Sequence, residues 1–136
     1  MATRELTALT FEQTVDADGI VLVDFWAAWC GPCLRFAPVF EEASQAHPDV
    51  VFGKVDTEAE QELAGVADIR SIPTLMAFRD GILVFSQPGA LPASALEQVI
   101  GAVRELDMDD IRAQIADAHT GEPKADLRSQ SVNTPA

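Results

Sequence analysis

The stretch Val23-Asp24-Phe25-Trp26-Ala27-Ala28-Trp29-Cys30-Gly31-Pro32-Cys33 decides the fold and holds both cysteines of the chain. Two residues separate the cysteines, a spacing at which they can close a small disulfide ring if the chain between them turns. Gly31 permits that turn and Pro32 restricts it. The strand-like run of residues 20–26 comes just before the pair, and a helix-compatible run follows it. The first cysteine is therefore predicted at a helix N-terminus.

That position favours a reactive sulfur. Unpaired backbone N–H groups and the helix dipole at a helix N-terminus stabilise a thiolate relative to a thiol. The thiolate is the species that attacks a disulfide. Because only the sulfur before the turn is expected to face outward, we predict that Cys30 is the attacking nucleophile and Cys33 the resolving thiol.

The full eleven-residue stretch closely resembles the active-site segment of the thioredoxin family, whereas two cysteines at this spacing alone would be a weak signal. The resemblance implies the thioredoxin fold over roughly residues 4–106 and the activity of a protein-disulfide reductase. The chain has no Gly-rich dinucleotide fingerprint, so no cofactor is expected beside the dithiol itself. Thioredoxin reductase and disulfide-containing client proteins are the partners that the resemblance implies.

Three other interpretations of the cysteine pair stay open. A zinc site would need about four ligands, and the two histidines lie far from each other and from the pair, so no metal site is expected. The pair could also be an inert structural disulfide or two merely buried cysteines. At the level of function, the alternatives are a thiol oxidase or isomerase on the same fold and a non-catalytic binding module.

Charge and composition limit the classes of partner that the protein could bind. Nine Lys and Arg stand against 22 Asp and Glu, a formal net charge of −13, which argues against nucleic acid and against an anionic membrane surface. No apolar run has the length of a membrane span, and residues 1–15 lack the basic and then hydrophobic order of a secretory signal. We therefore expect a cytoplasmic protein, and a monomer.

The hydrophobic pattern predicts an α/β fold: a central mixed five-stranded sheet flanked by about four helices. Capping-box patterns at residues 10–13 and 57–60 predict two helix starts, and Asp80-Gly81 predicts a hairpin turn. The expected strands cover residues 20–26, 50–56, 75–79 and 82–87, with a short piece near residues 4–9, and the longer helices cover 31–47 and a stretch starting near Pro92 or Ala93.

Residues 107–136 lie outside the family resemblance and form an acidic C-terminal extension to the domain of residues 1–106. Six acidic residues against three basic ones give this extension a net charge of −3. Met108, Ile111 and Ile115 could form the apolar stripe of a short helix, and the residues from 120 onward are polar and typical of a flexible tail.

Asp24 and Lys54 are the candidate groups for proton transfer. Asp24 interrupts a strand that is otherwise fit only for burial, and burial raises the pKa of a carboxyl group toward neutrality. The resemblance adds that thioredoxins use a buried aspartate here to take the proton of the resolving cysteine, and it matches Lys54 as a nearby buried partner. A solvated Asp24 at a strand edge and a Lys54 that snorkels to the surface are the alternatives.

A second motif, Ile72-Pro73-Thr74, is predicted beside the cysteines. In the family, this proline is cis and the backbone before it pairs with a bound peptide. The expected docking patch around Cys30 is flat, apolar and uncharged, and consists of Trp29, Gly31, Pro32, Ile72, Gly89 and Ala90.

Two aromatic residues and one positive charge flank the cysteine motif in the sequence. Phe25 and Trp26 are expected core residues, although Trp26 falls where the family keeps a tryptophan near the active site. Many thioredoxins have Lys after the second cysteine, while this chain has Leu34 and then Arg35. This departure bears on partner docking and on the tuning of the thiolate, but not on the reaction type.

Overall fold

The computed structural model describes residues 2–120, and the chain divides into two compact units, residues 1–104 and 105–136. No helix among the described residues is long and apolar enough to cross a bilayer. The predicted tail beyond residue 120 lies outside the described residues. The division into a domain of residues 1–106 and an extension of residues 107–136 stays a prediction.

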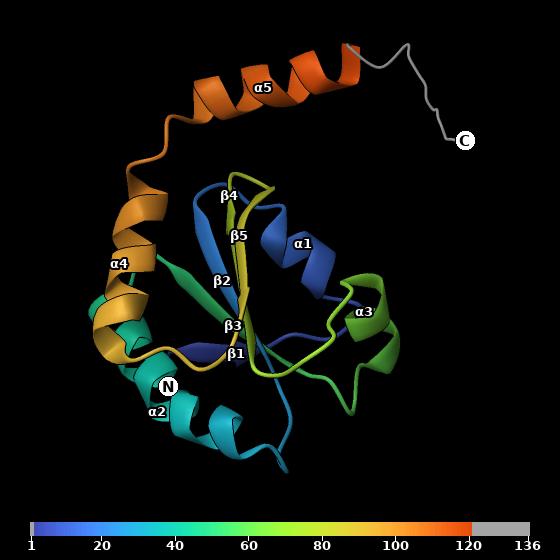
Figure 1. The fold of residues 1–136 in the computed structure, drawn as a ribbon, viewed down its shortest axis with the longest axis vertical. Helices are drawn as coiled ribbons and strands as arrows, with labels where there is room; N and C mark the ends of the chain where they lie inside the picture. Colours follow the sequence, from blue (N-terminus) through green and yellow to red (C-terminus); the bar gives the residue numbers. More distant parts are fainter. Residues whose placement is uncertain (1, 121–136) are drawn as a thin grey trace. The chain divides into compact units, whose positions relative to one another are not determined.

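A mixed five-stranded sheet forms the centre of the first unit, as predicted (Figure 1). The strand order is β1-β3-β2-β4-β5, with β1, β3 and β2 parallel and β4 and β5 antiparallel to their neighbours. The nearly continuous apolar run of β2 places this strand in the middle, where both of its faces are covered. The strands are β1 (Thr3–Glu5), β2 (Ile20–Trp26), β3 (Val51–Asp56), β4 (Thr74–Arg79) and β5 (Ile82–Pro88).

Two helices cover each face of the sheet. The helices of this unit are α1 (Phe11–Val15), α2 (Gly31–Ala46), α3 (Gln61–Val66) and α4 (Ala93–Arg104). Figure 1 shows α2 and α4 on one side of the strands and α1 and α3 on the other. The apolar side chains of β2 alternate accordingly: Leu22 packs with Phe36 and Phe40 of α2, whereas Val23 and Phe25 join the cluster on the α1 and α3 side.

The two predicted capping boxes are wrong in their hydrogen bonds. Thr10 precedes α1 but its side chain caps no helical N–H. The helix predicted to open at Thr57 begins only at Gln61, after Glu60, again without a side-chain cap. The Thr57 hydroxyl instead donates to the backbone oxygen of Trp26 at 3.0 Å, because the end of β3 lies beside the end of β2.

The turn between β4 and β5 is the predicted tight hairpin. Asp80 and Gly81 both have positive φ, 52° and 83°, which is the backbone geometry that favours Asp-Gly at a two-residue turn. The Asp80 carboxylate also accepts the N–H of Gly19 at 2.8 Å, which joins this turn to the start of β2. The hairpin therefore fixes the antiparallel half of the sheet.

The second unit contains α5 (Met108–Thr120). The side chain of Asp107 accepts the N–H of Asp110 at 3.1 Å, so an acidic residue caps the positive end of this helix. The short helix predicted from the apolar stripe is thus present, and it runs further along the chain than the stripe itself.

Candidate active site

The cysteine pair lies where β2 leads into α2. Cys30 is the N-cap of α2, and its Sγ accepts the N–H of Cys33 at 3.2 Å. Pro32 occupies the first turn, where its missing N–H leaves no helical hydrogen bond unmade. The two sulfurs are joined as a disulfide, with 5.2 Å between the Cα atoms. The predicted position of the first cysteine at a helix N-terminus is therefore found.

The expectation that Cys30 faces outward is wrong in degree. Cys30 is 4% exposed and Cys33 is 1% exposed, because both side chains pack with Ala27 and against Ile72. Cys30, however, lines a surface cavity, and Cys33 is not among its lining residues. Of the two cysteines, Cys30 thus borders this cavity, which a partner could enter.

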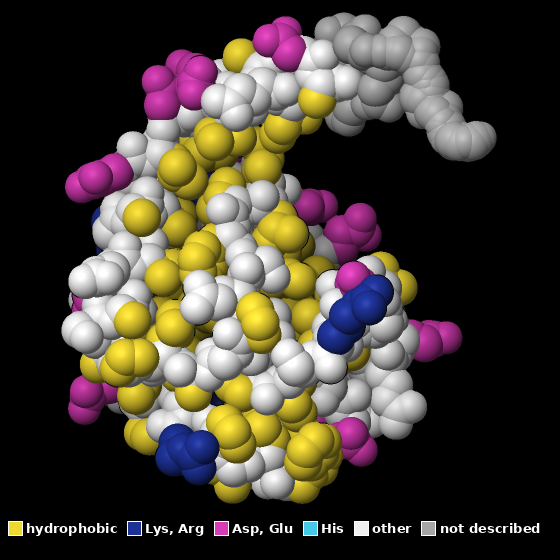
Figure 2. Space-filling model, in the orientation of Figure 1, with side chains coloured by type: hydrophobic (Ala, Val, Ile, Leu, Met, Phe, Trp, Pro, Cys, Tyr) yellow, Lys and Arg dark blue, Asp and Glu magenta, His cyan; other side chains and the backbone are white. Residues whose placement is uncertain are grey.

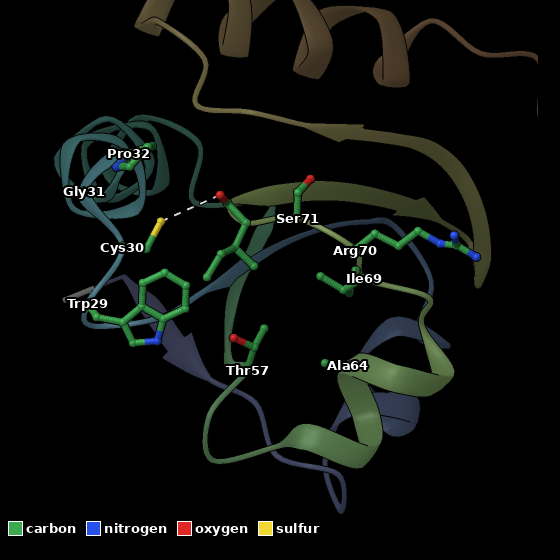
Figure 3. A pocket seen from close by; sticks show the side chains of 10 residues that line it. Trp29, Cys30, Gly31, Pro32, Thr57, Ala64, Ile69, Arg70 and Ser71 are labelled. Atoms are coloured by element: carbon green, nitrogen blue, oxygen red, sulfur yellow. Dashed lines mark hydrogen bonds between the residues drawn. The ribbon is translucent and has the colours of Figure 1, made fainter.

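That cavity has a volume of about 460 Å³ (Figure 3). Four members of the predicted docking patch line it together with Cys30: Trp29, Gly31, Pro32 and Ile72. The Sγ atom of Cys30 lies 3.7 Å from the backbone oxygen of Ile72, the contact marked in Figure 3. The backbone of Ile72, the residue before Pro73, therefore lies directly beside the Cys30 sulfur.

Five further residues of the cavity were not predicted: Thr57, Ala64, Ile69, Arg70 and Ser71. The last three directly precede Ile72 in the sequence, so the proximity of residues 69–71 could have been inferred from the predicted motif. Ala64 comes from α3 and carried no signal that relates it to the cysteines. Arg70 brings a charged group to the cavity, whereas the docking patch was predicted to be uncharged, and its Nε contacts Asp68 at 3.1 Å.

The proline loop has the geometry that the resemblance implied. The Ile72-Pro73 peptide bond is cis, and Pro73 is buried. The backbone oxygen of Pro73 accepts the N–H of Gly89 at 2.8 Å, and Gly89 has a φ of 104°, which favours glycine. Gly89 and Ala90 are exposed, and neither lines the cavity. The loop at Gly89 thus lies beside Pro73, and its place in the docking patch stays a prediction.

Exposed apolar side chains surround the start of α2. Trp29 is 70% exposed and Leu34 is 53% exposed, which is unusual for large apolar residues. Figure 2 shows hydrophobic side chains gathered at the lower end of the view, where α2 begins. A Cβ atom built on Gly31 would lie 3.5 Å from an Nη of Arg35, so this guanidinium folds back along the first turn. The positive charge displaced by one residue in the sequence thus lies beside Gly31, which stands between the two cysteines in the sequence.

Asp24 is buried in the centre of the sheet, as predicted. It is 0% exposed, and neither of its carboxyl oxygens has a hydrogen-bond partner in residues 2–120. Desolvation raises the pKa of Asp24 from 3.8 to about 7, an effect that the charge of Lys54 opposes and that of Glu5 reinforces. The carboxyl group can therefore hold and release a proton near neutral pH.

Lys54 differs from the expected buried partner. It is the direct register partner of Asp24 on β3, but it is only half-buried. Its Nζ lies 4.6 Å from the centroid of the Trp26 ring. Lys54 is thus near Asp24, and its ammonium contacts an aromatic face.

Strand alternation places these three side chains together. Asp24 and Trp26 follow Leu22 at two-residue intervals on β2, and Lys54 follows Phe52 on β3, so all share the face that α2 covers. Trp26 also packs against the cysteine cluster. One side chain therefore contacts both the redox pair and the lysine.

No group of three or more His, Cys, Asp or Glu residues in the described part of the chain could hold a metal ion. The chemistry that the described geometry supports is that of the disulfide itself: a cystine at a helix N-terminus, a cavity at one of its sulfurs, and a buried carboxyl group with a pKa of about 7 in the adjoining sheet.

Comparison with known proteins agrees with this chemistry. The thioredoxin family model matches residues 2–102. A protein of Streptomyces coelicolor that bears the name thioredoxin 2 is 58% identical over 116 residues, covering 85% of this chain and 87% of that protein. Because 116 residues exceed the 104 of the first unit, this similarity reaches into the second unit. A thioredoxin of Alicyclobacillus acidocaldarius is 44% identical over 103 residues, 75% of this chain and 98% of that one.

Solved structures give the same result for the fold. A mutant thioredoxin from Halobacterium salinarum superposes with a TM-score of 0.70 at 34% identity, covering 77% of this chain and 93% of that one. A thioredoxin of Plasmodium falciparum gives a TM-score of 0.68 at 37% identity, covering 73% and 97%. The chain therefore belongs to the thioredoxin family and is a thiol-disulfide oxidoreductase.

Proposed function

We propose that this protein is a protein-disulfide reductase that acts in the cytoplasm on disulfide-containing client proteins. The observation that carries the proposal is the asymmetry of the cystine: Cys30 caps α2 and lines the cavity, whereas Cys33 does not line it and is 1% exposed. In the reduced protein, the N–H of Cys33 and the helix N-terminus stabilise a thiolate at Cys30. This favours Cys30 as the sulfur that meets a client.

The reaction is an exchange of one disulfide for another. The Cys30 thiolate attacks one sulfur of the client disulfide, and the client's other sulfur leaves as a thiolate. Cys33 then loses its proton to Asp24 and attacks Cys30, which releases the second client sulfur. The client gains two electrons, and its two thiolates take up two protons: the one that Asp24 received from Cys33 and one from solvent, which replaces the proton that Cys30 lost on ionising. Cys30 and Cys33 end as the disulfide seen in the structure.

Client docking uses the surface around Cys30. Trp29, Gly31, Pro32 and Ile72 line the cavity, and the cis Pro73 holds the preceding backbone beside the Cys30 sulfur. An extended client segment could pair with the backbone at Ile72 and rest on the exposed Trp29 ring. Gly89 supports this surface through its hydrogen bond to Pro73, and Ala90 follows it in the exposed loop.

The oxidised protein needs an external electron source. We propose that thioredoxin reductase reduces the Cys30–Cys33 disulfide again, since the proposed reaction uses no redox group besides this dithiol and no resident cofactor. The test is reductase-coupled reduction of a model protein disulfide by the full chain. A Cys30→Ser, Cys33→Ser double variant should show only the background rate, and equal rates for this variant and the native protein would overturn the proposal.

The reduction potential separates reductase from oxidase. Equilibration of the Cys30 and Cys33 pair with a glutathione buffer measures this potential directly. A strongly reducing potential supports the proposal. A potential of about −120 mV, typical of a thiol oxidase, would contradict it.

A further inference from the structure

Lys54 and Asp24 are placed to form a salt bridge that the structure lacks. They are register partners on neighbouring parallel strands, where side chains of the same face stand roughly 5 Å apart. An ammonium group beside a buried carboxylate would ordinarily pair with it, because an isolated buried charge is costly. Both carboxyl oxygens of Asp24 nevertheless lack a hydrogen-bond partner within the described residues.

The Trp26 ring accounts for this arrangement. The Nζ of Lys54 lies 4.6 Å from the ring centroid, within the range of a cation–π contact, and Trp is the side chain that gives the strongest such contact. Trp26 follows Asp24 by two residues on β2 and therefore shares its face of the sheet. Trp26 also packs against the cysteine cluster of Ala27, Cys30 and Cys33.

We propose that Trp26 is a positioning residue for proton transfer at the cysteine pair: its ring holds the ammonium of Lys54 near Asp24 without pairing the two, so that the Asp24 carboxyl can take up a proton. This inference rests on the proton-accepting role of Asp24 in the proposed function. It assigns to Trp26 a task beyond core packing.

The position of the Lys54 charge, which the Trp26 ring holds, sets how readily the Asp24 carboxyl takes up a proton. A paired Lys54 would stabilise the Asp24 anion and leave it a weak base, whereas removal of the positive charge would keep the carboxyl protonated to higher pH. Beside Lys54, β1 contributes Glu5, the register partner of Lys54, and β4 contributes only the apolar Leu75 opposite Asp24. α2, which covers this face, brings Cys33 in its first turn into the cluster that Trp26 contacts, while its Glu41 accepts hydrogen bonds from Thr3 and Gln45.

Titration of the Asp24 carboxyl tests the inference directly. The oxidised full chain, labelled with ¹³C at aspartate side chains, is followed by NMR across pH, and the Asp24 resonance is identified as the one lost in Asp24→Asn. In Trp26→Leu we expect Lys54 to turn to Asp24 and the midpoint to fall by about one unit, a tenfold change in proton affinity. Trp26→Phe, with a weaker aromatic face, should give a smaller fall.

Lys54→Met distinguishes this effect from water that enters a loosened core. If the ring acts through Lys54, Trp26→Leu should no longer lower the midpoint in a Lys54→Met background. An equal fall in both backgrounds, or an unchanged or raised midpoint in Trp26→Leu with Lys54 present, would overturn the inference. Where Trp26→Leu does not fold, the same comparison with Trp26→Phe decides the question.

Trp29→Leu serves as the matched control, because it removes an exposed tryptophan three residues from Trp26 and should leave the Asp24 midpoint unchanged. The titration uses no client and no reductase. A failure of Asp24 to act in disulfide reduction would therefore appear in the activity assay and leave this measurement interpretable.

Discussion

Asp24 and Lys54 are register partners on neighbouring strands, yet in the part of the chain that the structure describes no hydrogen bond reaches either carboxyl oxygen of Asp24. The buried carboxyl group is thus held next to a positive charge without being neutralised by it. This relationship explains a pKa of about 7, since desolvation is only partly offset by Lys54.

The first prediction concerns stability. The folded pKa of Asp24 is raised to about 7 from 3.8, so the folded state keeps the proton while the unfolded state loses it between about pH 4 and pH 7. The free energy of unfolding should therefore fall as pH rises through this window. Asp24→Asn removes this loss and should be more stable than the native protein by up to about 4 kcal/mol above pH 7.

Urea unfolding of the oxidised proteins at about pH 4 and at about pH 8 measures this difference. The increase in the free energy of unfolding caused by Asp24→Asn should be small at the lower pH and large at the higher pH. A gain that is the same at both values would mean that the Asp24 carboxyl is not the titrating group.

The second prediction concerns turnover. Asp24→Asn cannot take the proton of Cys33, so disulfide reduction near pH 7 should slow by about tenfold or more. The difference should narrow toward pH 9, where solvent can deprotonate a thiol. Stopped-flow reduction of a model protein disulfide at several pH values checks both parts, and an unchanged rate across pH would remove Asp24 from the mechanism.

Much of the fold follows from local patterns that the structure bears out. The buried run of β2 and the Asp-Gly hairpin could be predicted because burial on both faces and positive φ leave direct marks in sequence. The capping box at Thr57 failed for a tertiary reason: Thr57 follows the end of β3, where its hydroxyl donates to the backbone oxygen of Trp26. Local propensity could not reveal that competing partner.

The site was predictable to a similar degree. The cysteines and the cis Pro73 lie in motifs, so their proximity followed from the family resemblance. The contact of Lys54 with Trp26 could not be predicted, because a cation–π contact depends on the conformations of two side chains on neighbouring strands. Ala64 could not be predicted as a cavity residue either, because the tertiary fold, rather than any local pattern, brings α3 to the cavity.

The third prediction tests close packing at the edge of the sheet. A Cβ on Gly53 would lie 2.5 Å from Cδ1 and 2.9 Å from Cγ of the buried Leu6. Gly53→Ala should therefore lose about 1–3 kcal/mol of stability. Gly101→Ala is the matched control: apart from the neighbouring backbone of α4 itself, no heavy atom of the described structure lies within 4 Å of a Cβ built on Gly101, and alanine in α4 should add roughly 0.5–1 kcal/mol of stability. Equal unfolding midpoints for the two variants would contradict the contact with Leu6.

The fourth prediction concerns the extension. The cavity-lining residues and the charged pair of the sheet all belong to the first unit, residues 1–104. A chain that ends at Leu106 should reduce a model protein disulfide at the same rate as the full chain, once circular dichroism shows that it is folded. A slower truncated chain would show that the extension takes part in the reaction.

The central claim is that Cys30 attacks and Cys33 resolves, and trapping of the mixed disulfide tests it most directly. The full-length Cys33→Ser and Cys30→Ser variants are each incubated with a disulfide-containing protein and analysed by intact mass spectrometry. We predict that Cys33→Ser accumulates a covalent adduct through Cys30, while Cys30→Ser accumulates almost none. Faster adduct formation through Cys33 in the Cys30→Ser variant would contradict the account.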